Sequence, residues 1–465
     1  MKSTGRFRWV ICGLLFALVA LSYIDRLNIA ILKKPISNQF GWSEVDYGNI
    51  AAAFSFAYAF GYLLAGRAID WLRVKRGLPV FMTVWSLAVA AHGLLALFGK
   101  ETVFHTSYPW FSFADKGFVM ATLLMPMSVA GFIFARIVLG LAEGANFPAA
   151  IRTVAEWFPV KERAYATGWF NAGTNVGAIL CPLTVPWIGI HFGWPVPFYL
   201  TGGLGLLWVI TWWFLYDEPE KQRWMSRSEL DYIRSGQLPA AGTAVKIPWL
   251  SLFKYRAVWA YVIASILAGP AWTFYQFFVA DFLQKRFHLG ELATGYWTGG
   301  FFALTAIGGI GGGWLAGMLI GRGWQLNSAR KLTLLICALC VLPLFSAPFA
   351  PTVWAAVLII GLAGAAHQGW SANLFSVVSD TMPREVISSV IGLGGFVCYF
   401  TGGVVSHLTG VIVERTGSYV PVFGYFSGMY VLSLIFLQLL VPKIGPLASN
   451  PSRSHDIERD MRLSR

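Results

Sequence analysis

Four ionisable residues lie deep inside long apolar stretches of the sequence: Asp25, Arg26, Arg136 and Glu143. A charge near the centre of a bilayer is costly, and such residues commonly mark a pathway for ions or substrates. A buried carboxyl that gains and loses an arginine neighbour changes its proton affinity and can act as a proton switch. An arginine without a permanent partner can hold a carboxylate ligand through two parallel hydrogen bonds. These residue types therefore predict proton transfer and anion binding.

The spacing of the four charges limits how they can pair. Arg136 and Glu143 are two helical turns apart, so they share one face of a helix. Asp25 and Arg26 are adjacent and point about 100° apart, so they cannot form a good pair with each other. We expect Asp25 to be directed toward Arg136 and Glu143, and Arg26 to be directed toward a central cavity. The alternative is a buried ion network that only fixes helix packing.

Uncharged polar side chains in other apolar stretches would complete a site for a hydroxylated ligand. Tyr23 precedes Arg26 by three residues and so lies on the same helix face. For each candidate, a hydrogen bond between helices is an equal alternative to ligand contact. For His367 a structural hydrogen bond is the simpler interpretation, and a gating or proton role is the alternative. The candidates are Tyr23, Tyr58, Asn171, Asn175, Tyr275, Gln276, Gln368, Ser371 and Asn373.

The elements that must position these residues are membrane-spanning helices. The chain of 465 residues is 56% apolar and 12% charged, whereas soluble domains are about 25% charged. Its mean hydropathy is +0.60, and many apolar stretches approach the ~20 residues that a spanning helix needs. We expect an all-α membrane protein with spans at 9–32, 48–69, 78–98, 123–151, 163–187, 196–216, 257–284, 295–320, 331–349, 352–378, 386–412 and 419–441.

The basic residues are distributed unevenly between the loops. Of 35 lysines and arginines, 26 fall on the side that carries both termini and seven on the other side. By the positive-inside rule both termini are cytoplasmic. The same pattern explains the net charge of +13 without a nucleic-acid partner. The five cysteines all lie in apolar spans, so we expect no metal or redox role for them.

The chain is predicted to contain two six-span halves, at 1–217 and 257–442. A cytoplasmic linker, 218–256, separates them and should carry a short helix that begins at a capping box, Ser226 to Glu229. The stretch "GYLLAGRAID" in the first half aligns with "GGWLAGMLIG" in the second, which indicates an internal repeat. The tail, 443–465, is expected to be disordered, and no role is assigned to an outer insertion at 100–124.

Span 8 is rich in glycine. Pairs with the spacing GxxxG recur at Gly308/Gly312, Gly309/Gly313 and Gly313/Gly317. Such pairs allow two helix backbones to approach closely, so we expect tight helix packing there.

Several motifs resemble those of a known family. The loop "AGRAIDWLRVKRG" resembles the major facilitator signature, except that Arg73 stands where a glycine is usual. The stretches "SYIDRLNIA", "LGLAEGANFPAA", "EWFPVKERAYATGWFNAGTNVGA" and "AHQGWSANLFSVVSDTMP" are together similar to the anion:cation symporter family. Within that family they are most similar to bacterial hexuronate and sugar-acid transporters.

This resemblance implies a major facilitator fold and a role for each matching residue. Asp25 and Glu143 match proton-coupling acids, and Arg136 matches an arginine that engages the helix-4 acid. Residues that match substrate contacts are Arg26, Tyr23 and Tyr58, followed by Asn171, Gln276, Gln368 and Asn373. The signature supplies a cytoplasmic gate made of Asp70, Arg73, Lys75 and Arg76.

Together, residues and resemblance predict a proton-coupled symporter that imports a sugar acid, a hexuronate or an aldonate, by alternating access. Arg26 would bind the carboxylate. Importing an anion against a negative-inside potential costs about 2.3 kcal/mol per charge per 100 mV, and co-moving protons cancel that cost. We expect a monomer in the bacterial inner membrane, with no cofactor, metal or enzymatic activity. The alternatives are an electrogenic uniporter or anion exchanger with structural charges, and a receptor that binds a sugar acid without moving it.

Overall fold

The computed structural model describes residues 6–98, 103–112, 117–235, 252–382 and 384–445. Within this part of the chain, twelve helical segments are long and apolar enough to cross a membrane, as predicted. The first group of elements comprises α1 (Phe7–Ile31), α2 (Lys33–Phe40), α3 (Glu44–Leu94), β1 (Val103–Ser112), β2 (Gly117–Pro126), α4 (Met127–Glu143), α5 (Asn146–Trp157), α6 (Val160–Phe192), α7 (Pro195–Leu215) and α8 (Arg227–Ser235). The second group comprises α10 (Arg256–Ala268), α11 (Pro270–Phe287), α12 (Glu291–Gly321), α13 (Leu326–Val341), a 3-10 segment (Leu342–Phe349), α14 (Val353–Thr381), α15 (Arg384–Thr416) and α16 (Val420–Leu440).

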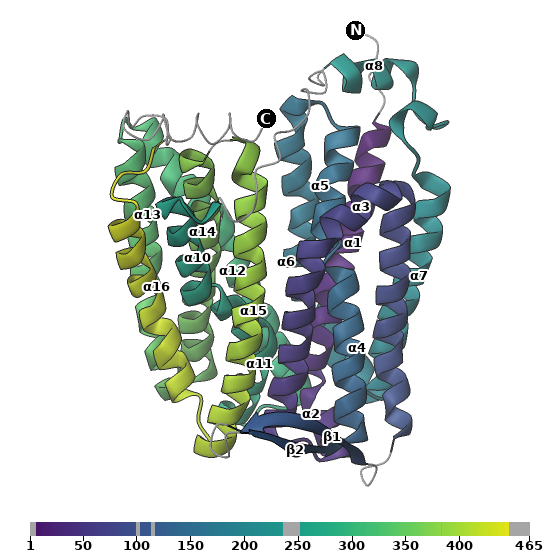
Figure 1. Cartoon of the computed structure of the whole chain (residues 1–465), viewed down its shortest axis with the longest axis vertical. Helices are drawn as coiled ribbons and strands as arrows, with labels where there is room; N and C mark the ends of the chain where they lie inside the picture. Colours follow the sequence, from purple (N-terminus) through teal and green to yellow (C-terminus); the bar gives the residue numbers. More distant parts are fainter. Residues whose placement is uncertain (1–5, 99–102, 113–116, 236–251, 383, 446–465) are drawn as a thin grey trace.

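The two groups of spanning helices stand side by side, α1 to α7 in one and α10 to α16 in the other (Figure 1). The described chain begins and ends at the same end of the bundle, which we call the terminal face. The opposite end carries β1 and β2, and we call it the hairpin face. The tail predicted to be disordered lies outside the described residues from position 446 onward.

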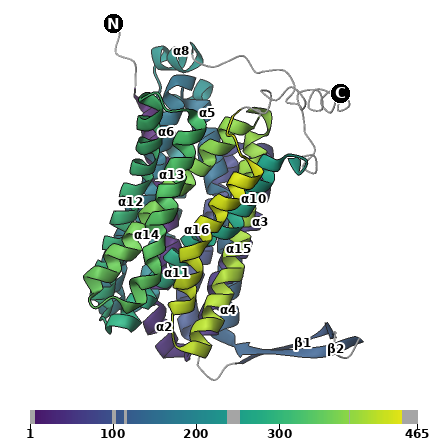
Figure 2. The same cartoon turned by 90° about the vertical axis from the view of Figure 1, so that its left-hand side faces the viewer.

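The predicted insertion contains an antiparallel hairpin, in which Val103 pairs with Pro126 and Ser112 with Gly117. Figure 2 shows that β1 and β2 extend sideways from the bundle. The expected span 123–151 was therefore wrong at its start, because residues up to Pro126 belong to β2. A proline disfavours the helical conformation in the residue before it, so the apolar run cannot enter α4 until Pro126 has passed.

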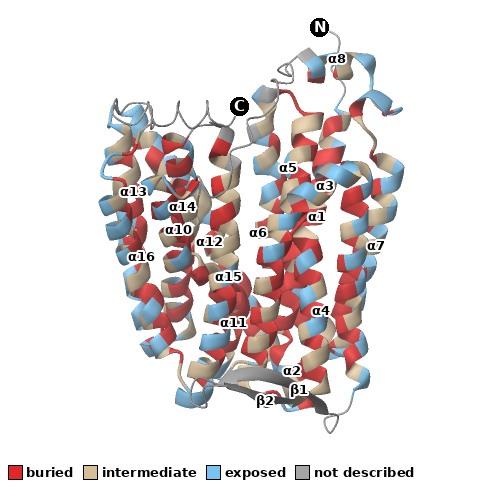
Figure 3. Ribbon diagram, in the orientation of Figure 1, coloured by how far each residue is buried: buried red, intermediate tan, exposed pale blue. Residues whose placement is uncertain are grey.

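Buried residues lie mainly on the sides of the helices that face one another (Figure 3). Large apolar side chains on the outer surface remain exposed, among them Phe214, Trp354 and Leu439. A surface of this kind is suited to lipid chains rather than to water.

Helix α3 supplies two spans because the chain reverses direction within it. Ser43 caps its first turn, accepting from the N–H of Asp46 at 3.0 Å, while the Asp46 carboxylate accepts from the N–H of Ser43. At Arg73 the backbone leaves the helical region, with φ 59° and ψ 155°. This is the position where the family signature has glycine, the residue that adopts positive φ without strain.

Close helix contact in the second group depends on two glycines of α12. A Cβ atom at Gly308 would lie 2.0 Å from the Ala365 carbonyl oxygen, and one at Gly312 would lie 2.3 Å from the Gly369 Cα. The predicted pair Gly308/Gly312 is therefore confirmed as a packing motif against α14. The other two predicted pairs were wrong, because a Cβ at Gly313 or Gly317 would meet nothing within 4 Å.

Replacing Gly312 with alanine should destabilise the protein, whereas the same change at Gly313 should not. The new methyl group at 312 meets backbone that cannot move aside, and such overpacking costs about 1–3 kcal/mol. Thermal unfolding of the purified protein in detergent should show a lower apparent Tm for Gly312→Ala and an unchanged one for Gly313→Ala. Equal Tm values for the two variants would contradict the proposed contact between α12 and α14.

Candidate functional site

The candidate site is centred on Arg26 of α1. Its side chain is only 2% exposed, and it forms an ion pair with Glu143 at the end of α4. Its Nη1 atom also donates to the hydroxyl of Tyr399 on α15, at 3.3 Å. The guanidinium therefore contacts an acid of its own helix group and a phenol of the other group.

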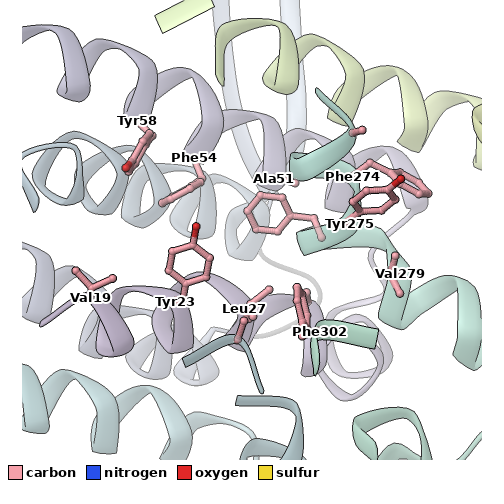
Figure 4. Close-up of a cluster of buried hydrophobic side chains, with 14 of the residues drawn as sticks. Val19, Tyr23, Leu27, Ala51, Phe54, Tyr58, Phe274, Tyr275, Val279 and Phe302 are labelled. Atoms are coloured by element: carbon pink, nitrogen blue, oxygen red, sulfur yellow. The ribbon is translucent and has the colours of Figure 1, made fainter. Parts of the chain in front are cut away.

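Aromatic rings surround this guanidinium. Its Cζ atom lies 5.0 Å from the ring centre of Tyr23, 5.1 Å from that of Phe54 and 4.7 Å from that of Tyr58. Figure 4 shows these three side chains next to one another, on α1 and α3. Rings at this distance attract a cation and exclude water from it. The rings therefore stabilise the charged guanidinium of Arg26.

Gly140 of α4 and Gly144, which directly follows this helix, bring Glu143 to its position. A Cβ at Gly140 would lie 2.7 Å from the Phe54 carbonyl oxygen, and one at Gly144 would lie 2.5 Å from the Gly61 carbonyl carbon. Without side chains at these positions, α4 packs directly on the backbone of α3. The helix then ends at Glu143 and the next begins at Asn146, so the acid stands at a break between two helices.

Asp25 faces a different neighbour from the one we expected. Its Oδ2 atom accepts a hydrogen bond from the indole N–H of Trp85, at 2.9 Å, and its Oδ1 atom has no hydrogen-bond partner in the described part of the protein. The expectation for Arg26 was therefore wrong in this state, because Arg26 pairs with Glu143 of α4. Asp25 lies within electrostatic range of Glu143 and Arg136, as expected, but forms no ion pair with a described residue.

Arg136 lies close to the ion pair without joining it. Its Nη1 atom donates to the backbone carbonyl of Arg26 at 3.5 Å, while its Nε and Nη2 atoms have no partner among the described residues. The resemblance assigned the helix-4 acid to Arg136, but Glu143 pairs with Arg26 here. One oxygen of Glu143 also lacks a partner among the described residues. Buried polar atoms are normally satisfied, so this site has unused hydrogen-bonding capacity.

The structure brings together only part of the predicted substrate site. Tyr23, Arg26 and Tyr58 are in contact, whereas four weaker candidates lie on other helices. Asn373 ties helices together: its amide donates to the carbonyls of Gly312 and Gly369, and its oxygen accepts from Arg330. The other three lie on three different helices: Asn171 is exposed on α6, Gln276 is buried on α11 and Gln368 is half-buried on α14.

His367 is held by two neighbours. Its Nδ1 atom is 2.5 Å from the Tyr430 hydroxyl, and its ring stacks on Trp272 with 5.5 Å between centroids. This geometry agrees with the simpler interpretation, a structural hydrogen bond.

The predicted gate residues pair within their own helix group in this state. Arg73 forms an ion pair with Glu218 at 3.0 Å, and Lys75 forms one with Asp217 at 2.7 Å. Burial opposes ionisation of Asp217, but the hydrogen bond from Lys75 holds the pKa of this carboxyl below its usual range. The hydrogen bond from Lys221 likewise lowers the pKa of Glu218. The side chain of Asp70 lies outside the described residues.

A partly buried charge cluster at the hairpin face was not predicted from the sequence. Lys33 contacts Asp281 at 2.8 Å and Glu44 at 2.7 Å, and Lys285 contacts the same acids at 2.9 and 2.5 Å. Tyr419 also donates to Asp281. We call Lys33, Glu44, Asp281 and Lys285 the hairpin-face cluster. The lysines looked like ordinary loop charges, but Asp281 and Lys285 stand four residues apart on one helix, a spacing that could have signalled a pair.

Tyr399 and Trp85 were also missed. Each is an aromatic residue within an apolar span. Nothing in a single sequence distinguishes such a residue from an ordinary core side chain.

Comparison with known proteins identifies the family. The profile of the Major Facilitator Superfamily matches residues 15–407. This chain belongs to that superfamily. Membership makes it a multi-pass transport protein rather than an enzyme, in agreement with the twelve spans.

Similar proteins support the narrower resemblance as well. The chain is 27% identical to the hexuronate transporter of Escherichia coli strain K12 over 92% of each chain. It is 30% identical to the galacturonate transporter of Dickeya chrysanthemi, over 74% of this chain and 92% of that one. Its fold matches the crystal structure of a D-xylose-proton symporter with a TM-score of 0.72 at 15% identity, over 94% of this chain and 99% of that one.

In this major facilitator protein the two helix groups meet mainly at the hairpin face. Besides the hairpin-face cluster, the Tyr47 hydroxyl donates to the Phe277 carbonyl at 2.6 Å, and His407 pairs with Asn49 at 2.7 Å. These contacts close the bundle at the hairpin face.

Replacing Asp281 with asparagine should weaken this closure. Asp281 and Lys33 are both 5% exposed, and removing one partner of such a buried pair costs roughly 3–5 kcal/mol. Spin labels at Lys34→Cys and Arg415→Cys, in a background without the native cysteines, should report longer distances by electron paramagnetic resonance. The control is Glu291→Gln, a change on the same face outside the cluster. An unchanged distance distribution for Asp281→Asn would show that the cluster does not hold the face closed.

Proposed function

We propose that this protein is a proton-coupled symporter that imports a sugar acid, a hexuronate or an aldonate. The observation that carries the proposal is the buried Arg26–Glu143 ion pair, enclosed by tyrosine rings where the two helix groups meet. The similar proteins support the substrate class, since they are transporters of hexuronate and galacturonate.

Substrate binding would exchange one carboxylate for another at Arg26. The planar guanidinium matches a carboxylate through two parallel hydrogen bonds, which a lysine cannot reproduce. The hydroxyls of Tyr23, Tyr58 and Tyr399 surround the same guanidinium and would bond the hydroxyl groups of the sugar acid. Tyr399 belongs to the second helix group, so a ligand at Arg26 would connect both groups.

Proton coupling would arise from competition for Arg26. When Glu143 is ionised it occupies the guanidinium, and when it is protonated it loses most of its attraction for the cation. Protonation of Glu143 therefore frees Arg26 for the substrate, and by linkage substrate binding favours protonation. Asp25, which faces Trp85, would be the second proton-carrying acid. Arg136 would position the site through its contact with the Arg26 carbonyl.

Alternating access would use the two faces of the bundle in turn. By the positive-inside rule both termini would lie in the cytoplasm, so the hairpin face would be the outer face. The hairpin-face cluster would then close the outer side in the state seen here. Arg73, Lys75 and Arg76, with Asp70, would form the gate on the cytoplasmic side in the opposite state. We further propose that the protein works as a monomer in the bacterial inner membrane.

Uptake by proteoliposomes tests the proposed activity and narrows the substrate. The purified protein should accumulate D-galacturonate, D-glucuronate or D-galactonate when the external medium is more acidic than the lumen. Neutral D-xylose is the matched control, because it offers hydroxyl groups without a carboxylate. A protonophore should abolish the accumulation. Uptake that only equilibrates, with or without the gradient, would instead indicate a uniporter or exchanger.

A further inference from the structure

A cavity away from Arg26 opens at the terminal face, where the reversal of α3 meets the end of α7. Its volume is about 570 Å³, and we call it the bend pocket. Four basic side chains line it, together with two acidic ones and two tryptophans: Arg73, Lys75, Arg76 and Lys221, with Asp217 and Glu218, and Trp71 and Trp213. Among the described lining residues, cations therefore outnumber anions by two.

The two acids do not neutralise this pocket. Glu218 forms ion pairs with both Arg73, at 3.0 Å, and Lys221, at 2.6 Å. Asp217 forms an ion pair with Lys75. Both acids remain ionised at neutral pH, because their pKa values are lowered by these contacts. Arg76 is exposed and has no ion pair with any described residue. The excess positive charge is thus available to an external anion.

The pocket lies at the ends of two membrane spans, which is the depth at which lipid headgroups are expected. The spans Trp71–Leu97 and Pro195–Leu215 end at its walls. Trp71 is 83% exposed and Trp213 is 49% exposed, and tryptophan gathers where a membrane meets water. Phe214 continues the exposed apolar surface of α7 beside the pocket. A basic pocket of this kind, at the end of an apolar outer surface, suits an anion that carries acyl chains.

The backbone of Arg73 is unfavourable for an arginine. At φ 59° a residue with a side chain is strained, and glycine is not. Strained residues gather at ligand-binding positions. A glycine at position 73 would give the same turn without strain. The arginine that stands there instead adds a positive charge to the wall of the pocket.

We propose that the bend pocket binds the phosphate of an anionic phospholipid, with the acyl chains lying along α7 past Trp213. Arg73 and Arg76 would hold the phosphate oxygens by charge-assisted hydrogen bonds. Phosphatidylglycerol has the required charge, whereas phosphatidylcholine is neutral overall. The site is separate from Arg26, so the proposal does not depend on the proposed transport activity.

Native mass spectrometry of the full chain tests the proposal, with phosphatidylglycerol or phosphatidylcholine added to the delipidated protein in detergent. We expect phosphatidylglycerol to bind and phosphatidylcholine not to bind. The variant Arg73→Gly suits the turn, so it should fold, and it should bind phosphatidylglycerol about fivefold more weakly. The variant Arg73→Gly/Arg76→Gln should lose binding. The control is Arg322→Ala, which removes an exposed cation from the same face in the other helix group and should bind normally.

Three results would overturn the proposal. One is equal retention of both lipids by the wild-type protein. Another is undiminished phosphatidylglycerol binding by Arg73→Gly/Arg76→Gln. The third is displacement of phosphatidylglycerol by millimolar inorganic phosphate, because the pocket would then recognise a free anion rather than a lipid.

Discussion

Replacing Glu143 with glutamine should abolish the accumulation of sugar acid under a pH gradient while leaving exchange of labelled for unlabelled substrate. Glutamine is close to the shape of a protonated glutamate and cannot ionise. It would leave Arg26 permanently free for substrate, so binding should persist or become tighter. Because Glu143 is the acid that competes with the substrate for Arg26, substrate binding would no longer depend on protonation, and a gradient could not drive uptake even if Asp25 still carried a proton.

The two readouts distinguish lost coupling from lost folding. With one coupled proton, a gradient of one pH unit should support roughly tenfold accumulation in the wild-type protein and none in Glu143→Gln. Exchange of external labelled substrate against a loaded lumen should continue in both proteins. Glu291→Gln, an acid-to-amide change at the hairpin face, should retain full accumulation. A Glu143→Gln protein that still concentrates substrate would refute the role given to Glu143.

Replacing Arg26 with alanine should remove sugar-acid binding. A buried, hydrogen-bonded charge pair loses about 2–5 kcal/mol when one partner is truncated, which is a factor of roughly 30 to several thousand in Kd. Arg26→Lys keeps the charge but loses the planar pair of donors, so it should also bind weakly. Isothermal titration calorimetry with D-galacturonate measures the loss directly.

A second variant separates a binding defect from misfolding. Arg26→Ala leaves Glu143 buried without its ion partner, which destabilises the protein by itself. The double variant Arg26→Gln/Glu143→Gln removes both charges, so it should recover the thermal stability of the wild type and still fail to bind. If the double variant bound D-galacturonate with the wild-type Kd, Arg26 would not be the carboxylate site.

The twelve spans could be predicted because each depends on a local run of apolar residues. The start of α4 could not, since the apolar run at 123–126 belongs to a strand and only the conformational effect of Pro126 divides it from the helix. The glycine motif of α12 was recognised by its spacing, but spacing alone does not say which of several glycine faces meets α14. That choice depends on how α12 is rotated against its neighbour.

The residues of the site could be predicted from the sequence more readily than the pairs that they form. Sequence spacing shows that Asp25 and Arg26 point in different directions, but it does not show which of them faces Glu143. The answer depends on how α1 and α4 are rotated about their axes, and Gly140 and Gly144 fix only α4, by packing it on α3. The hairpin-face cluster was missed for a similar reason, because it joins Lys33 of the first helix group to Asp281 of the second.

The role of the site depends on whether the ion pair between Arg26 and Glu143 can open. A permanent ion pair between Arg26 and Glu143 would make the site a structural element, whereas a pair that opens on protonation makes it a coupling device. One oxygen each of Asp25 and Glu143 and two nitrogens of Arg136 have no hydrogen-bond partner among the described residues. Such a site can change its hydrogen bonds without moving its helices far.

The most direct test is the pH change that substrate itself causes. Proteoliposomes containing the purified protein, at equal pH inside and outside and with a pH-sensitive dye in the medium, are given D-galacturonate or the best substrate from the uptake experiments. The account predicts that the external medium becomes more alkaline on addition of the sugar acid, and that Glu143→Gln proteoliposomes show no such change. Substrate entry at the wild-type rate without any alkalinisation would contradict proton coupling at the Arg26–Glu143 pair.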